Sequence, residues 1–104
     1  MTNQGTVFAD PVAEKRLLAA CIDNPEMTLR LRELLFTGER VQIYQGMRKC
    51  FIQYGEITYE GIQLIMGRAL PAEYEAARGA RPDAIIDVLV NIARRRELAN
   101  VSDR

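Results

Sequence analysis

The sequence predicts an all-α fold, a compact bundle of about six short helices that ends in a helical hairpin. Three observations carry this prediction. Apolar residues recur at the i, i+3/i+4, i+7 spacing of amphipathic helices and do not alternate as they do in strands. Proline and glycine separate these segments at short intervals. The 104 residues, 48% of them hydrophobic, are enough for the core of one domain.

Asp10-Pro11 starts the first helix, after a polar arm of residues 1–9 that we expect to be flexible. Asp10 can accept hydrogen bonds from the free amides of the first turn, and Pro11 suits the first helical position. Asn24-Pro25 repeats this signal, so we expect a second helix from there to about residue 36. Its inward-facing side chains are expected to be Met27, Leu31, Leu34 and Leu35.

The third helix, over about residues 41–54, has the clearest apolar stripe. The stripe consists of Ile43, Tyr44, Met47, Cys50, Phe51 and Tyr54. Its aromatic residues could form a binding pocket, but a stripe at this spacing is more typical of a core. Gly46 costs about 1 kcal/mol relative to Ala inside a helix, which predicts a close approach of another helix there. Thr58 should cap a fourth helix that ends at Gly67.

Residues 68–104 are expected to form the hairpin and the start of a linker, following a core subdomain of residues 10–67. A short arm over 71–78 precedes a turn, and a longer arm begins at Pro82. The apolar residues of the long arm cover about 200° of a helical wheel, about twice what one core requires. We therefore expect the hairpin to contact a second chain as well as its own domain. The predicted dimer interface consists of Tyr74, Ala77, Ile85, Ile86, Leu89, Val90 and Ala93.

The composition argues against catalysis within this chain. There is no His, which excludes Ser-His-Asp and Cys-His mechanisms and zinc sites that contain His. Two cysteines are too few for a four-thiolate zinc site. We expect Cys21 and Cys50 to be buried thiols in a reducing compartment, although a redox pair is the alternative. The sequence thus predicts no catalytic, metal-binding or cofactor-binding residue.

The charge balance, 14 Lys+Arg against 14 Asp+Glu, disfavours strong direct DNA binding. We interpret Arg94-Arg95-Arg96 as surface charge that complements the helix dipole, with contact to nucleic acid or an acidic partner as the alternative. Asp83 and Asp87 are expected to be solvated. No apolar run reaches the ~18 residues of a membrane span, and the N-terminus lacks the pattern of a signal peptide. These features predict a cytoplasmic protein.

Several blocks of the sequence resemble the N-terminal domain of bacterial replicative DNA helicases of the DnaB type. The first block contains Ala13-Glu14, Leu17-Leu18, Ala20, Ile22 and Asp23-Asn24-Pro25. The second contains Phe36, Ile43-Tyr44, Gly46, Met47 and the segment Phe51 to Gly55, followed by Ile57-Thr58 and Ile62 to Ile65. The chain departs from the family pattern at Ala19, at Val41-Gln42 and in residues 67–81.

The resemblance implies a non-catalytic collar domain that assembles a replicative helicase. In the family, hairpins pair into dimers, the dimers form the collar of a hexamer, and the collar docks primase or a helicase loader. ATP and Mg²⁺ belong to a downstream motor domain, whose G-x-x-x-x-G-K-[ST] loop this chain lacks. Two alternatives stay open. One is the helicase-binding C-terminal domain of a primase, or a small phage replication protein, of the same fold. The other is a small helical DNA-binding regulator.

Overall fold

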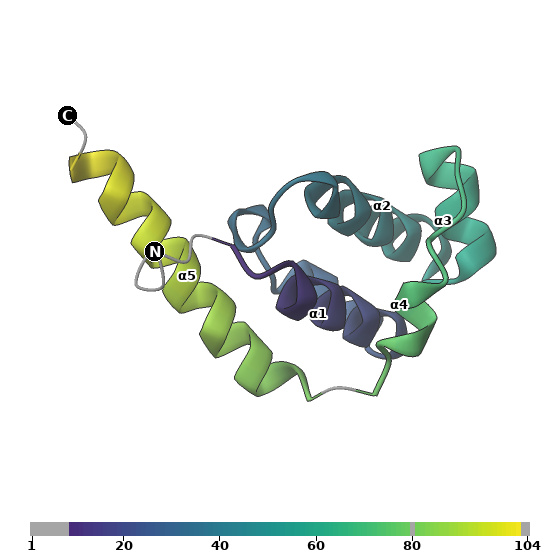
Figure 1. The fold of residues 1–104 in the computed structure, drawn as a ribbon. Helices are drawn as coiled ribbons and strands as arrows, with labels where there is room; N and C mark the ends of the chain where they lie inside the picture. The colour runs from purple at the N-terminus through teal and green to yellow at the C-terminus, as the bar shows by residue number, and fades with distance from the viewer. Residues whose placement is uncertain (1–8, 80, 103–104) are drawn as a thin grey trace.

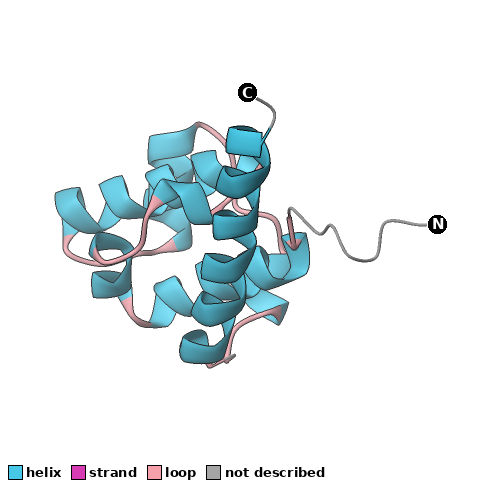
Figure 2. Cartoon of the chain, turned by 90° about the vertical axis from the view of Figure 1, so that its left-hand side faces the viewer, coloured by secondary structure: helices cyan, strands magenta, loops and turns pink. Residues whose placement is uncertain are grey.

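The structure, a computed structural model, describes residues 9–79 and 81–102, with side chains up to residue 98. Apart from Ala9, the predicted N-terminal arm lies outside the described residues. All regular secondary structure in the described part is helical, and this part contains no strand, as the sequence predicted (Figure 2). None of its helices is long and apolar enough to cross a membrane. The elements are α1 (Pro11–Asp23), η1 (Pro25–Leu29), η2 (Glu33–Leu35), α2 (Glu39–Tyr54), α3 (Tyr59–Met66), α4 (Glu73–Ala76) and α5 (Pro82–Ser102), where η denotes a 3₁₀ helix.

Helix α1 lies at the centre of the fold. It contacts α2, α4, α5 and η1, and α2 in turn contacts α3 (Figure 1). The helix begins as predicted, because Oδ1 of Asp10 accepts a hydrogen bond from the backbone N–H of Ala13 at 3.1 Å. Three of its side chains, Leu17, Leu18 and Cys21, are fully buried. Elements distant in sequence are therefore held together by packing on this one helix.

The single second helix expected over residues 25–36 is wrong, since this segment forms the two short 3₁₀ helices η1 and η2. The hydroxyl oxygen of Tyr44 lies 2.7 Å from the carbonyl oxygens of both Thr28 and Leu31, and its one hydrogen serves one carbonyl at a time. These carbonyls would otherwise accept the bonds that continue an α-helix. Leu34, expected to point inward, is exposed as a result. Asn24 donates its side-chain amide to the carbonyl oxygen of Ala20 and so closes α1, without capping η1.

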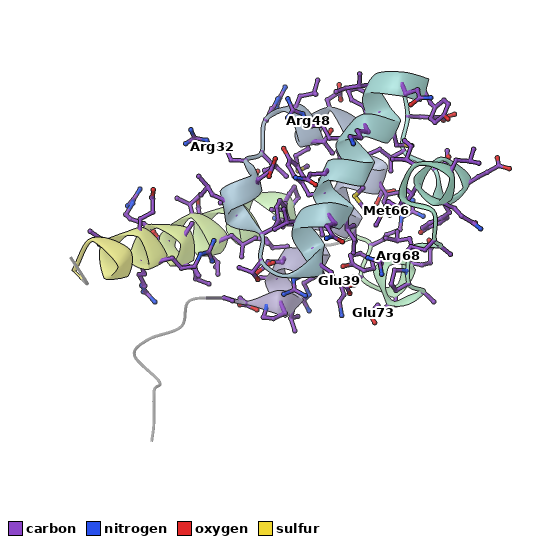
Figure 3. The ribbon with its side chains drawn as sticks, turned by 90° about the horizontal axis from the view of Figure 1, so that it is seen from above. Arg32, Glu39, Arg48, Met66, Arg68 and Glu73 are labelled. Carbon is purple, nitrogen blue, oxygen red and sulfur yellow. The ribbon has the colours of Figure 1, made fainter. Side chains whose placement is uncertain are left out.

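Helices α2 and α3 pack closely because each contributes a buried glycine to their contact. A Cβ atom on Gly46 would lie 2.7 Å from Cγ of Met66, which confirms the predicted close approach (Figure 3). A Cβ atom on Gly61 would lie 2.6 Å from Sγ of Cys50. Thr58 caps α3 as expected, its hydroxyl accepting from the N–H of Gly61 at 3.0 Å. Neither glycine can gain a side chain without moving its neighbour.

Both arms of the C-terminal hairpin rest on α1. Ion pairs from Lys15 to Glu73 and from Arg78 to Asp23 tie α4 to the central helix. Helix α5 adds four side chains to the core that α1 and α2 already share: Ile85, Leu89, Ile92 and Ala93. One continuous core therefore joins the predicted core subdomain to the predicted hairpin.

Candidate functional site

The predicted dimer interface is largely core in the folded chain and needs correction. Four of its seven residues are buried within this chain: Tyr74, Ile85, Leu89 and Ala93. Burial also raises the pKa of Tyr74 to about 12. Ala77 and Ile86 are half-buried, and Val90 is exposed. Only these last three remain accessible to a partner.

The wide apolar arc of α5 explains this outcome. The middle of the arc faces α1, while its two margins remain at the surface. Ile86 and Val90 occupy one margin, and Val88, 44% exposed, occupies the other. The outermost face between the margins carries polar residues: Asp87, Asn91, Arg94 and Arg95. Up to residue 98, where its side chains are described, helix α5 thus lacks a second broad apolar face and presents two narrow apolar margins.

A groove of about 380 Å³ lies between the segment 30–35 and α5, and we call it the α5 groove. Its most accessible apolar residues are Leu31, Leu34, Ile86 and Val90. Arg96 donates a hydrogen bond to the carbonyl oxygen of Leu34, which joins α5 to η2 beside the groove. The volume falls within the range typical of protein binding pockets. The departure from a continuous helix at residues 30–32 creates this groove.

The rim of the α5 groove is basic. Arg30, Arg32 and Arg94 line it, with Glu97 as the single acid among its lining residues. Some other cations of the fold are held in ion pairs: Arg40 binds Glu14, Arg68 binds Glu39, and Arg78 binds both Asp23 and Glu75. Within residues 9–79 and 81–102, no ion pair involves the three arginines of the rim. A neutral chain therefore carries a locally positive groove.

A second exposed apolar area, the α2–α3 patch, is formed by Ile52, Tyr54, Leu64 and Ile65. Ile52 is 65% exposed and Leu64 70% exposed, and Lys49 and Gln53 border them. Tyr54 was expected in the core stripe, but it is 47% exposed. Helix α3 and α5 lie on opposite sides of α1 and α2 (Figure 1). The chain therefore presents two separate apolar surfaces.

A buried carboxylate, which the sequence analysis named only within a resemblance block and without a role, fixes the start of α2 against α1. The side chain of Glu14 is fully buried and accepts hydrogen bonds from Thr37 N at 2.7 Å, Thr37 Oγ1 at 2.8 Å and Arg40 Nε at 2.8 Å. Together these bonds satisfy both carboxylate oxygens. In sequence, a Glu in the first turns of a helix is indistinguishable from ordinary dipole-stabilising charge. Its helical position alone therefore gave no signal of burial.

The remaining candidate chemistry is structural. Tyr44 stacks on Phe36 with ring centroids 5.0 Å apart, and burial raises its pKa, so it acts as a core hydrogen-bond donor. Cys21 and Cys50 are buried free thiols, as expected, and burial raises the pKa of Cys21 to about 12. Within the described part of the chain, no three His, Cys, Asp or Glu side chains gather in a way that could hold a metal ion.

Comparison of the chain with protein-family models, with curated proteins and with solved structures finds no match.

Proposed function

We propose that this chain is a non-catalytic assembly domain, of the collar type found at the N-terminus of DnaB-type replicative DNA helicases. In this role it would associate with copies of itself, as a dimer and within a hexamer, and dock a primase or a helicase loader during DNA replication. ATP and Mg²⁺ would be bound by a motor domain elsewhere in the same protein. The sequence blocks that resemble this family motivate the proposal.

The observation that carries the proposal is the presence of two separate apolar surfaces, the α5 groove and the α2–α3 patch. A collar domain must contact a neighbouring copy and a docking protein at the same time, so it needs two surfaces. Exposed apolar groups gathered in one place mark interaction sites more often than scattered ones do. The small size of each surface fits contacts that are completed by repetition around a ring.

The test has two parts. First, the reading frame on both sides of this chain is sequenced. A G-x-x-x-x-G-K-[ST] loop downstream is the expected result, whereas a primase core upstream would favour the helicase-binding domain of a primase. Second, the full gene product is examined by sedimentation velocity. We expect an oligomer that Ile52→Asp dissociates, because the substitution places a charge in an apolar contact of the α2–α3 patch. A monomeric product whose gene has neither flanking region would refute the proposal.

The DNA-binding regulator is kept as a second candidate because the rim of the α5 groove contains Arg30, Arg32 and Arg94. If it is correct, the chain binds duplex DNA, and binding weakens steeply as the salt concentration rises. The test is to titrate a fluorescent DNA duplex with the chain at about 0.05 M and about 0.15 M salt. Binding that weakens between the two salt concentrations supports this candidate, and no binding at either excludes it.

A further inference from the structure

We propose that the α5 groove binds an acidic amphipathic helix of a partner protein. The inference deepens the proposed function by naming the chemistry of a docking partner, and it rests on that function only in taking the groove to be a docking surface. The inference is based on two neighbouring features. The groove has apolar walls that include Leu34, Ile86 and Val90. Its rim carries arginines that have no ion-pair partner in the described part of the chain.

The walls of the groove determine the apolar half of the partner. Leu34 is 41% exposed and Val90 36% exposed, and both stand on rigid elements, η2 and α5, which contact each other. A groove between two helical elements accepts the apolar stripe of a third helix, with side chains at i, i+3/i+4 and i+7. Burying these side chains removes apolar surface from water on both partners.

The rim determines the charged half of the partner. Arg30 and Arg32 stand on the η1–η2 side of the groove and Arg94 stands on α5, so basic groups flank the apolar walls from both sides. Arg32 points away from the body of the fold, whereas Arg68 and Glu39 lie beside each other (Figure 3). A guanidinium presents a planar set of donors that matches a carboxylate. A helix with Asp or Glu on both sides of its apolar stripe would complement this rim.

A second copy of the chain is a poorer occupant. A two-fold contact through the groove places the same surface against itself. Arg30, Arg32 and Arg94 would then lie near the same three guanidinium groups of the partner copy, with only Glu97 of each copy to offset them. Self-association is therefore assigned to the α2–α3 patch, whose own lining holds one cation, Lys49, while Arg48 and Arg68 line the adjacent hollows that Ile52 and Ile65 also border.

Nucleic acid is also a poorer occupant. A phosphate backbone is recognised by cations and needs no apolar wall. The groove places exposed leucine and valine side chains where a backbone would lie, and Glu97 would repel phosphate. The formal charge of the whole chain is zero, so long-range attraction is weak.

The test uses a fluorescent synthetic helix of about 18 residues (~27 Å long), with Leu at i, i+3/i+4 and i+7 and with Asp and Glu elsewhere. A peptide of the same composition in scrambled order is the control. We expect the amphipathic peptide to bind the chain with a dissociation constant of about 50 µM, measured by fluorescence anisotropy at about 0.15 M salt. The scrambled peptide should bind at least about tenfold more weakly, because it cannot present one apolar stripe.

Variants of the chain locate the site. Arg32→Ala/Arg94→Ala should weaken binding about tenfold, the combined effect of two exposed ion pairs. Arg95→Ala, which removes an exposed cation of α5 that does not line the groove, should leave it unchanged. Val90→Asp should abolish binding, and Val88→Asp, on the other margin of α5, should not. Circular dichroism checks that each variant folds. If Val90→Asp does not fold, the arginine variants still test the site.

Equal binding of the scrambled peptide, or equal weakening by Arg95→Ala, would overturn the inference, since binding would then follow charge alone. Tighter binding of a duplex DNA of similar length, lost in Arg32→Ala/Arg94→Ala, would overturn it in favour of nucleic acid. Dissociation of a wild-type oligomer by Val90→Asp alone would assign the groove to a second copy. That last result would leave the proposed function intact. A monomeric product from a gene without helicase or primase regions would instead refute the proposed function, and it would leave peptide binding to the groove unaffected.

Discussion

Truncation of Glu14 tests whether the buried carboxylate holds α1 to the start of α2. In Glu14→Ala, the backbone N–H of Thr37, its hydroxyl and Nε of Arg40 lose an acceptor that now lies 2.7 to 2.8 Å away. The carboxylate is fully buried, whereas the Arg40 side chain is 19% exposed. Water can therefore hydrate the guanidinium in the variant but reaches the amide of Thr37 less easily.

The expected loss follows from these contacts. An unsatisfied buried donor costs about 1–3 kcal/mol, and removal of one member of a buried ion pair costs about 3–5 kcal/mol. Because Arg40 is partly hydrated, we expect the lower limit of the second range, about 3 kcal/mol. A domain of this length has a free energy of unfolding of about 5–15 kcal/mol, so the loss is a large share of the total.

Urea unfolding followed by circular dichroism measures the loss. With a slope of about 1.5 kcal/mol per molar urea, 3 kcal/mol lowers the midpoint by about 2 M. The matched control is Glu39→Ala, which removes an exposed ion pair to Arg68 and should cost less than about 1 kcal/mol. Glu14→Gln should fall between the two, since its carbonyl oxygen can still accept from Thr37 while its amide faces Arg40. If Glu14→Ala loses no more stability than Glu39→Ala, the carboxylate is hydrated in solution and the reasoning fails.

Three further predictions follow from the packing and the surface. Gly61→Ala should lower the free energy of unfolding by about 1–3 kcal/mol, because the new methyl group overlaps Cys50. Adding Cys50→Ala should restore part of this loss. A double variant no more stable than Gly61→Ala would contradict the prediction. Leu89→Asp should unfold the chain, because it places a charge in the core; a native circular dichroism spectrum would show that Leu89 is not core. In Arg78→Ala, the pKa of Asp23, now lowered chiefly by its hydrogen bond from Arg78, should rise toward 3.8 in an NMR titration. Because the folded-state pKa is lowered, the pair stabilises the fold above the unfolded pKa, and this contribution is lost as the pH falls through the folded value.

Local signals in the sequence were sufficient where the determining contacts are local. The Asp10 cap, the Thr58 cap and the glycine end of α3 involve residues three or four positions apart, and the structure confirms them. The error over residues 25–36 arose from a contact distant in sequence. The hydroxyl of Tyr44 interacts with carbonyl groups of Thr28 and Leu31, which are 16 and 13 residues away. Periodicity cannot reveal such a competitor for backbone hydrogen bonds.

The candidate site could not be predicted from the sequence for a related reason. A helical wheel gives the width of an apolar arc, but how much of the arc is buried depends on the elements beside the helix. Here α1 covers the middle of α5, and η2 reaches only one margin. The predicted interface residues Ile85 and Leu89 became core, while Ile86 and Val90 became the wall of the α5 groove. The arginines of the rim come from segments about 60 residues apart, so no window of the sequence could place them together.

The same geometry links the fold to its proposed partners. A continuous helix over residues 25–36 could have presented its apolar stripe inward and covered the margin of α5. The two 3₁₀ turns instead leave Leu34 outward and place Arg30 and Arg32 beside Val90. A fold under no demand except stability would gain by burying Leu34 fully, since a leucine that is 41% exposed forfeits about 1 kcal/mol of transfer free energy. The hydroxyl of Tyr44 interrupts the helix and so shapes the groove. Its removal should therefore change both the stability of the fold and its docking of a partner. Tyr44→Phe should loosen residues 28–35 in hydrogen exchange and weaken peptide binding together, whereas an effect on stability alone would separate the groove from the turn that forms it.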